Sequence, residues 1–374
     1  DGYELYVSIA DVSHYVQQGT ALDTQAYERG TSTYFPNTVV PMLPKILSND
    51  VCSLKPAEDR LAVTVRLTFT KNGTLSRTSF FTSIIRSAMR LTYKKVEKAL
   101  IHKDKKTRTS LKDVINELEL MKELAEILAE KRTQRGSLDF DLPEPEVILD
   151  IEGGVKGIVR SERLFAHRII EEFMIAANEA VAQYLHGKRI PAIYRIHERP
   201  DREKLMDFER LLQNLPLKHK KPEGHTGYLQ AILKSASGTQ YEFLVNKILL
   251  KSMKQAKYSV SNKGHFGLAS DCYLHFTSPI RRYPDLVCHR ALKYALSHKH
   301  DADKDRFLPL QELDRMAIHL SERERIAMEA ERELEDRIKV LFMKDKIGEI
   351  YEGIISHITS FGIFVELLEY FVEG

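Results

Sequence analysis

The chain has 374 residues, of which 43% are hydrophobic and 29% are charged. These proportions are typical of a globular protein with a sizeable core, and they exclude fibrous and wholly disordered classes. No run approaches about 18 consecutive apolar residues, so the sequence predicts no helix that spans a membrane. The formal net charge is only +3, so a nucleic-acid partner would require basic residues gathered in one groove.

The three cysteines, Cys52, Cys272 and Cys288, form no C-x-x-C pair. A sparse and odd number of cysteines favours a reducing compartment over a disulfide scaffold. We therefore expect a cytoplasmic protein.

The first third of the chain predicts strands followed by a helix. Apolar residues alternate with polar or small ones from Tyr3 to Ile9, which is typical of a strand. Residues 61–85 predict a β-hairpin, because alternation resumes there and Asn72-Gly73 supplies a turn that accepts positive φ. Residues 110–135 predict a helix with a capping box at Ser110 and Asp113, ended by Gly136.

Two further helices are predicted, over residues 161–185 and 310–346. In the second, apolar residues recur every seven positions, at Leu313, Leu320, Ala327, Leu334 and Leu341. Because Arg323 and Arg337 interrupt the neighbouring row, we expect this helix to pack on the flank of the domain rather than to form a zipper. Residues 348–374 predict strands, and the charge-rich residues 298–306 predict a solvated loop.

The most informative motif runs from Thr277 to Asp285 and contains Arg281 and Arg282. A rigid turn with two guanidinium groups suits phosphate oxygens, which a planar fork binds bidentately. The alternative is that these arginines pair with carboxylates to hold the fold, with Asp285 as a partner for Arg282.

Two other segments leave alternatives open. Residues 30–36 are a loop with Tyr34 and Phe35, which are either stacking platforms for bases or anchors that pack on the core. Residues 139–146 are acidic, but Pro143 and Pro145 favour an extended segment whose carboxylates alternate between faces, which disfavours a metal site. The histidines show no zinc-type spacing.

The C-terminal pattern G-x-I-x-x-I-x-x-F-G-x-F-V fits the first two strands of an OB-type barrel. Exposed aromatic and basic residues of such barrels face RNA. Phe361 and Phe364 are candidates for that face, although one of them is expected in the core.

Seven segments, in chain order, resemble the catalytic domain of the ribonuclease II / ribonuclease R family. The strings RGTSTYFP and HFTSPIRRYPDL are nearer to the ribonuclease R branch of that family. The resemblance covers roughly residues 3–345, and the segments that carry it are IADVSHYV, ERGTSTYFPNTVVPMLPKILSNDVCSL, RLTYKKV, AHRIIEEFMIAAN, RIHERPD, HFGLAS and HFTSPIRRYPDLVCHR.

The resemblance implies an α+β fold. A large mixed α/β ribonuclease catalytic domain would occupy residues 1–345, incomplete at its N-terminus, and the start of an RNA-binding OB-type β-barrel would occupy residues 346–374. It implies a 3′-to-5′ exoribonuclease, a hydrolase that degrades single-stranded RNA processively to nucleoside 5′-monophosphates. It further implies magnesium, no small-molecule cofactor, no membrane partner and a monomer.

The resemblance also assigns site residues. Arg281 matches the catalytic arginine that holds the phosphate beside the scissile bond, and Arg282 is its neighbour at the RNA. Tyr34 matches the aromatic residue that stacks near the 3′ end and governs the length of the final product. The other matches to RNA-contacting residues are the aromatics Tyr93 and Phe140 and the acidic residues Glu171 and Glu331.

One departure concerns the metal. The metal-binding aspartates of the family lie in a D-P-x-x-x-x-D-x-D-D string just before the first strand, and this string is absent here. We therefore expect the ligands upstream of Asp1. The alternative is a non-catalytic RNA-binding relative, or an inactive fragment, that keeps the RNA channel without the metal site. A third hypothesis is a hydrolase of small molecules that binds metal at Asp139 and Asp141.

Overall fold

A three-stranded antiparallel sheet, in the order β1–β4–β5, organises the N-terminal part of the chain. The structure is a computed structural model that describes residues 2–140, 145–149, 154–161, 163–217, 225–297, 307–360 and 362–374. The strand predicted from Tyr3 to Ile9 is confirmed as β1 (Gly2–Ala10), which pairs with β4 (Asp59–Thr70). The predicted hairpin is confirmed by the pairing of β4 with β5 (Leu75–Arg86).

The tip of this hairpin requires glycine. Gly73 has φ of +71°, a conformation that L side chains rarely adopt. A Cβ atom at this position would also lie 2.4 Å from Cγ2 of Ile127. Since Ile127 belongs to α5 (Ile115–Arg135), the glycine lets the hairpin tip approach that helix closely.

Helices α5 and α6 lie near the predicted positions but begin later. The capping box predicted at Ser110 and Asp113 is wrong, because Ser110 ends a separate helix, α4 (Lys105–Ser110), and α5 begins after Val114 with no side-chain cap. Gly136 ends α5 in the left-handed conformation, as predicted. The helix predicted from residue 161 is α6 (Phe165–Gly187).

The remaining elements are short strand pairs and helices. The pairs are antiparallel and join β2 to β3, β6 to β7, β8 to β9 and β10 to β11. The strands are β2 (Thr33–Phe35), β3 (Thr38–Val40), β6 (Pro145–Leu149), β7 (Val155–Arg160), β8 (Tyr194–Ile196) and β9 (Lys257–Ser259). The helices are α1 (Val12–Tyr15), α2 (Ala21–Arg29), η1 (Leu47–Val51), α3 (Tyr93–Leu100), α7 (Arg202–Gln213), α8 (His225–Ala236), α9 (Glu242–Ser252), η2 (Phe266–Leu268), α10 (Tyr283–Ser297) and α11 (Leu310–Lys344).

Three hydrophobic clusters make up the core of the described residues. The first lies between the sheet and helices α3, α5, α6 and α10, with Val65, Leu67 and Phe173 among its buried members. The second joins the end of β1 to α2, α10 and α11. The third gathers α7, α8 and α9 around Leu138, so the segment after α5 is fixed in that cluster.

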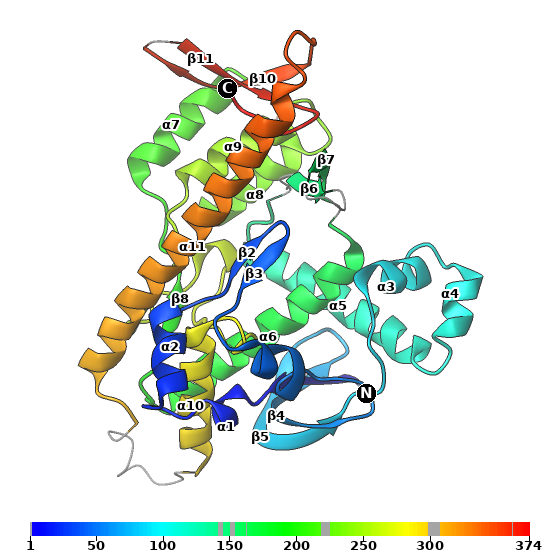
Figure 1. Ribbon diagram of the computed structural model, residues 1–374, viewed down its shortest axis with the longest axis vertical. Coiled ribbons are helices and arrows are strands. Elements are labelled where there is room, and N and C mark those ends of the chain that lie inside the picture. Colours follow the sequence, from blue (N-terminus) through cyan, green and yellow to red (C-terminus); the bar gives the residue numbers. More distant parts are fainter. Residues whose placement is uncertain are drawn as a thin grey trace.

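Helix α11 runs along one side of the molecule, from the region of α2 and α10 to the β10–β11 hairpin (Figure 1). Packing on the flank of the domain is confirmed for its first half, where Leu313, Leu320 and Ala327 are buried. The prediction is wrong for Leu341, which is 65% exposed. The heptad row is therefore buried only as far as Ala327.

The C-terminal residues form strands, as predicted. β10 (Gly353–Thr359) pairs with β11 (Gly362–Leu367), and Lys247 of α9 forms ion pairs with Glu366 and Glu373 that hold this hairpin. Phe364 is half-buried. The predictions for Phe361 and for the loop at residues 298–306 lie outside the described residues.

Several histidines are buried as neutral side chains. His289 is fully buried, stacks on Phe276 and donates from Nε2 to the backbone oxygen of Phe276 at 2.8 Å. Burial lowers the pKa of His289 from 6.5 to about 4. Burial also lowers the pKa of His265 to about 3. In the unfolded chain both side chains take up a proton first as the pH falls, so acid favours unfolding.

We expect the pH dependence of stability to report these histidines. Since the folded pKa of His289 lies below its ordinary value, its contribution is complete above about pH 6.5 and is lost as the pH falls toward 4. In that range each such group contributes a slope of about 1.4 kcal/mol per pH unit. Urea unfolding between pH 7 and pH 4 should show a shallower slope for His289→Gln. The exposed-site control His102→Gln should keep the original slope, and equal slopes in both variants would contradict the assignment.

Candidate functional site

The turn that carries Arg281 is built around the carboxylate of Asp285. This side chain is fully buried and accepts the backbone N–H of Ser278 at 2.7 Å. It also accepts two hydrogen bonds from the guanidinium of Arg282, at 2.8 and 2.7 Å. Burial alone would lower the pKa of Arg282, but the adjacent carboxylate raises it above its ordinary value. Arg282 is therefore held as a cation inside the turn.

The N-terminal loop is fastened to the same turn. The backbone oxygen of Arg281 accepts hydrogen bonds from the N–H of Ser32 at 2.9 Å and from Oγ1 of Thr31 at 3.1 Å. The backbone oxygen of Gly30 accepts the N–H of Tyr283 at 2.9 Å. Gly30 has φ of +69°, and a Cβ atom there would lie 2.8 Å from Cβ of Arg323, so glycine is required. These contacts bring β2 beside the arginine turn.

A pocket of about 390 Å³ opens where the two segments meet. Among the described residues that line it, Arg281 is the only charged one. Its lining residues are Ser8, Ile9, Ala10, Tyr34, Ser48, Cys52, Ser53, Leu54, Thr277, Ser278, Pro279, Ile280 and Arg281. Such a lining suits an anionic group held beside an apolar one.

Two side chains that line this pocket, Tyr34 and Cys52, differ in exposure. Tyr34 is 45% exposed, which favours a contact surface over the alternative of a buried loop anchor. Cys52 is buried, and burial raises the pKa of its thiol to about 11. The thiol is therefore protonated at neutral pH and is a poor nucleophile.

Glu331 reaches this site from α11. Its Oε1 accepts the backbone N–H of Tyr34 at 2.6 Å. The structure thus brings together three residues that the resemblance assigned, namely Arg281, Tyr34 and Glu331. In the described chain the carboxylate of Glu331 holds the position of β2.

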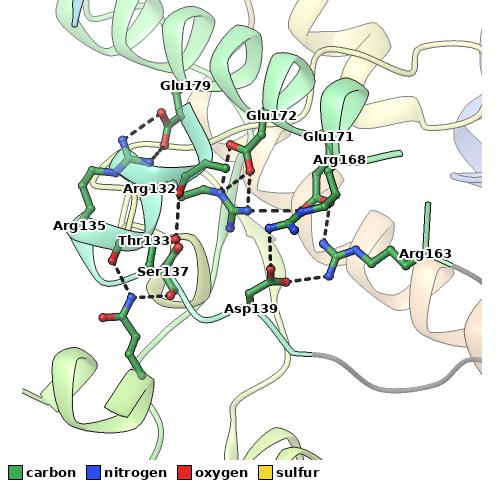
Figure 2. Close-up of polar contacts among 12 residues, drawn as sticks. Arg132, Thr133, Arg135, Ser137, Asp139, Arg163, Arg168, Glu171, Glu172 and Glu179 are labelled. Carbon is green, nitrogen blue, oxygen red and sulfur yellow. Dashed lines mark hydrogen bonds and ion pairs between the residues drawn. The ribbon is translucent and has the colours of Figure 1, made fainter. Parts of the chain in front are cut away.

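Glu171 lies in a separate network on α6 (Figure 2). Arg163 donates to Oε2 of Glu171 and to Oδ1 of Asp139, both at 2.8 Å. Arg168 lies 3.6 Å from Asp139. Deeper in the network, Arg132 donates hydrogen bonds to the buried carboxylate of Glu172, at 2.6 and 3.0 Å.

The remaining assigned aromatics, Tyr93 and Phe140, lie in different surroundings. Tyr93 begins α3, is 46% exposed, and contacts His167 with ring centroids 4.0 Å apart. Phe140 is half-buried against the third hydrophobic cluster and directly follows Asp139. Tyr93 thus contacts α6 directly, whereas Phe140 is linked to Glu171 only through the ion pairs of Asp139 and Arg163.

Sequence reasoning missed Arg163, His167 and Asp139 as members of this site. His167 precedes Glu171 by four positions, so these two share one face of α6, whereas Arg163 lies before the N-cap Leu164, whose backbone is extended. The spacing of His167 and Glu171 was a signal for a common face. The pairing of Arg163 with Asp139, 24 residues away, had no local signal.

The described residues do not fit a metal centre. Among them, no group of three or more His, Cys, Asp or Glu side chains is placed to hold a metal ion. Asp139, considered for a metal, instead pairs with Arg163 and Arg168, and Asp141 lies outside the described residues. No chemical step is therefore assigned to a metal on these side chains. In the same part of the chain no helix is both long and apolar enough to cross a membrane.

The sequence and the fold match a known family. The family model of the RNB domain matches residues 1–298. The chain belongs to the RNB-domain family. The resemblance seen in the sequence is thereby confirmed.

Relatives and solved structures agree with this membership. Ribonuclease R of Aquifex aeolicus is 47% identical over 373 residues, which is all of this chain and 52% of the relative. Ribonuclease R of Escherichia coli is 39% identical over all of this chain and 47% of the relative. A structure of Mycoplasma genitalium RNase R in complex with ribose methylated single-stranded RNA superposes with a TM-score of 0.92 at 32% identity, covering 99% of this chain and 58% of that one. The chain thus spans about half the length of the curated relatives it matches.

The two neighbouring arginines should respond differently to substitution. Arg282→Met leaves the buried carboxylate of Asp285 without its cation, so we expect the free energy of unfolding to fall by about 3–5 kcal/mol. Arg281 is exposed, so Arg281→Met should change it by less than about 0.5 kcal/mol. Urea unfolding of both variants measures this difference. Similar losses in the two variants would show that the turn does not depend on the Arg282–Asp285 pair.

Proposed function

We propose that the chain is the RNA-holding catalytic domain of a 3′-to-5′ exoribonuclease. The substrate is single-stranded RNA, which is hydrolysed processively to nucleoside 5′-monophosphates in RNA degradation. The observation that carries this proposal is the pocket in which Arg281 is the only charged described residue and lies beside the exposed Tyr34. Two similarities support it, namely to curated proteins named ribonuclease R and to the Mycoplasma genitalium RNase R that was solved with single-stranded RNA.

The chemistry of the pocket suits one end of an RNA strand. The fork of Arg281 can hold two phosphate oxygens at once, and it would stabilise the negative charge on those oxygens during cleavage. Tyr34 offers a ring for stacking on a base, a contact that is independent of sequence and contributes about 1–3 kcal/mol. Since Arg282 is engaged with Asp285, we assign it to the turn rather than to RNA.

The other assigned residues extend the path. Tyr93 and Phe140 would stack on bases further from the 3′ end, and Glu171 would accept hydrogen bonds from the RNA. Glu331 would act by keeping Tyr34 in place. We divide the chain at residue 345, with a ribonuclease domain before it and the first strands of an OB-type barrel after it. The β10–β11 hairpin is consistent with such a start.

The metal and the cellular setting are part of the proposal. We propose magnesium as the metal of the complete enzyme, where it would supply Lewis-acid chemistry at the scissile phosphate. The described residues contain no group of three or more His, Cys, Asp or Glu side chains placed to hold it. We further propose a monomer that acts in the cytoplasm, which suits three cysteines that are buried and free of disulfides.

A chimera tests catalysis directly. In it, this chain replaces the matched part of Aquifex aeolicus ribonuclease R. We expect the chimera to degrade a 5′-labelled single-stranded RNA with a free 3′ end, and Arg281→Lys to lower the single-turnover rate by about 10²- to 10³-fold, because an ammonium cannot hold two phosphate oxygens. RNA affinity should fall by less than about tenfold.

The matched control is Arg86→Lys, an exposed arginine that pairs with Asp59 at the end of the hairpin. It should leave both rate and affinity unchanged. A folded chimera that binds RNA but never cleaves it would favour the non-catalytic alternative. A lower melting temperature with an intact rate in Arg281→Lys would make Arg281 structural.

Tyr34 should control how far degradation proceeds. In the same chimera, Tyr34→Ala removes the ring that grips the last nucleotides, while longer RNA keeps its other contacts. We expect the shortest product to lengthen while a long RNA is degraded at a similar initial rate. Gel analysis of the limit product measures this, with Tyr6→Ala, an exposed tyrosine on β1, as the control. An unchanged limit product would return Tyr34 to a structural role.

A further inference from the structure

A single guanidinium joins two segments that flank the proposed RNA path. Nη1 of Arg163 donates to Oδ1 of Asp139, and Nη2 donates to Oε2 of Glu171, both at 2.8 Å (Figure 2). Asp139 precedes Phe140 on the segment after α5, and Glu171 lies in the second turn of α6. The arginine therefore fixes the carboxylate on α6 relative to the segment that carries the aromatic ring.

The segment is anchored on its other side by the fold. The backbone N–H of Leu138 donates to the oxygen of Gly267 at 2.8 Å, and the Leu138 side chain is buried in the third cluster. Asp139 is thus the point at which the segment is tied to α6. A second cation, Arg168, lies 3.6 Å from Asp139, which is longer than a direct hydrogen bond.

The charges of the network show why Arg163 is needed. Without Arg163, the nearest cation to Glu171 in this network would be Arg132, at 3.8 Å. Arg132 already forms an ion pair with Glu172 at 2.6 Å. Asp139 and Glu171 would then repel each other. Lysine cannot replace the fork, because one ammonium does not present two donors in a fixed plane. Burial alone would lower the pKa of Arg163, but the hydrogen bonds to both carboxylates raise it, so the side chain stays charged.

We propose that Arg163 is a positioning residue that holds Glu171 and the Phe140 segment in the arrangement that receives single-stranded RNA. This inference rests on the proposed function. Arg163 touches the two carboxylates, and through them it sets where RNA contacts occur. Its side chain is 40% exposed, and exposed ion pairs contribute little to stability. If Arg163 served stability alone, its substitution would therefore have little effect on folding and none on RNA binding.

The absence of tryptophan allows a fluorescent reporter to be introduced, and a second ion pair of the chain provides a matched control. The chain contains no tryptophan, so Phe140→Trp introduces a single tryptophan on the tied segment, which can be excited selectively above the absorption of the 16 tyrosines. Arg135 pairs with Glu179 between α5 and α6 at 2.9 Å and is 44% exposed. Arg135→Met therefore removes a comparable ion pair elsewhere on the same helix pair.

Two measurements on the 374-residue chain test the inference. In the Phe140→Trp background, acrylamide quenching of the introduced tryptophan should rise about twofold with Arg163→Met and stay unchanged with Arg135→Met. In the chain with native Phe140, Arg163→Met should weaken binding of a labelled single-stranded RNA octamer by about tenfold. Arg163→Lys should lie between, Arg135→Met should change affinity by less than about twofold, and melting temperatures should report equal folding.

The outcomes separate the two claims. Equal quenching and equal affinity in Arg163→Met and Arg135→Met would overturn the role of Arg163. Altered quenching with unchanged RNA affinity would overturn its role in receiving RNA. If the unsubstituted chain binds no RNA, the proposed function fails, and the quenching comparison still decides whether Arg163 fixes the Phe140 segment.

Discussion

The buried carboxylate of Asp285 is the constraint on which the candidate site depends. A charge without solvent is tolerated only when it is paired and its oxygens accept hydrogen bonds. Asp285 meets this condition by accepting from the backbone N–H of Ser278 and from Nε and Nη2 on one edge of the Arg282 guanidinium. Those bonds close the turn at residues 278–282, and the closed turn leaves Arg281 exposed. Arg282 is thus paired inside the folded turn, whereas the side chain of Arg281 is exposed to solvent.

The rest of the site is assembled on that turn from distant parts of the chain. The backbone oxygen of Arg281 anchors the loop at residues 31–32, and Glu331 of α11 holds the N–H of Tyr34. In each of these hydrogen bonds, the site residue contributes a main-chain atom, namely the backbone oxygen of Arg281 or the backbone N–H of Tyr34. Such bonds fix the path of the backbone and leave the Tyr34 ring and the Arg281 guanidinium unconstrained. The site is therefore rigid in its frame, while its two recognition groups remain available.

Periodicity in the sequence located β1, the long hairpin, α6 and α11, because alternation and the 3.6-residue repeat reflect burial on one face. Periodicity failed where residues distant in the sequence determine the start of a helix or the burial of a side chain. Ser110 has the chemistry of a cap, yet it closes α4 instead of opening α5. Leu341 continues the heptad but extends past the second cluster, so nothing in the described core covers it. Local sequence does not contain that information.

The site residues likewise divide into those that are close in the sequence and those that only the tertiary fold brings together. Arg281 and Arg282 were visible because they are adjacent within one motif, and so was the Arg282–Asp285 pair, which spans three positions. The link between Tyr34 and Glu331 spans 297 positions, and the link between Arg163 and Asp139 crosses from the end of α5 to the start of α6. Only the tertiary fold determines such contacts. The resemblance named Tyr34, Glu171 and Glu331, but not the Tyr34–Glu331 contact and not Arg163, which holds Glu171.

The pattern of pairing also explains how a chain of net charge +3 can select an anionic ligand. A paired arginine contributes little to the attraction of a phosphate, because the nearby carboxylate cancels its field at the distances that matter in salt. Arg132, Arg163 and Arg282 are all neutralised in this way. Arg281 differs, since no described carboxylate lines its pocket. In the proposed function, local imbalance of charge rather than total charge would therefore direct a phosphate to this pocket, while the paired networks around it hold the fold.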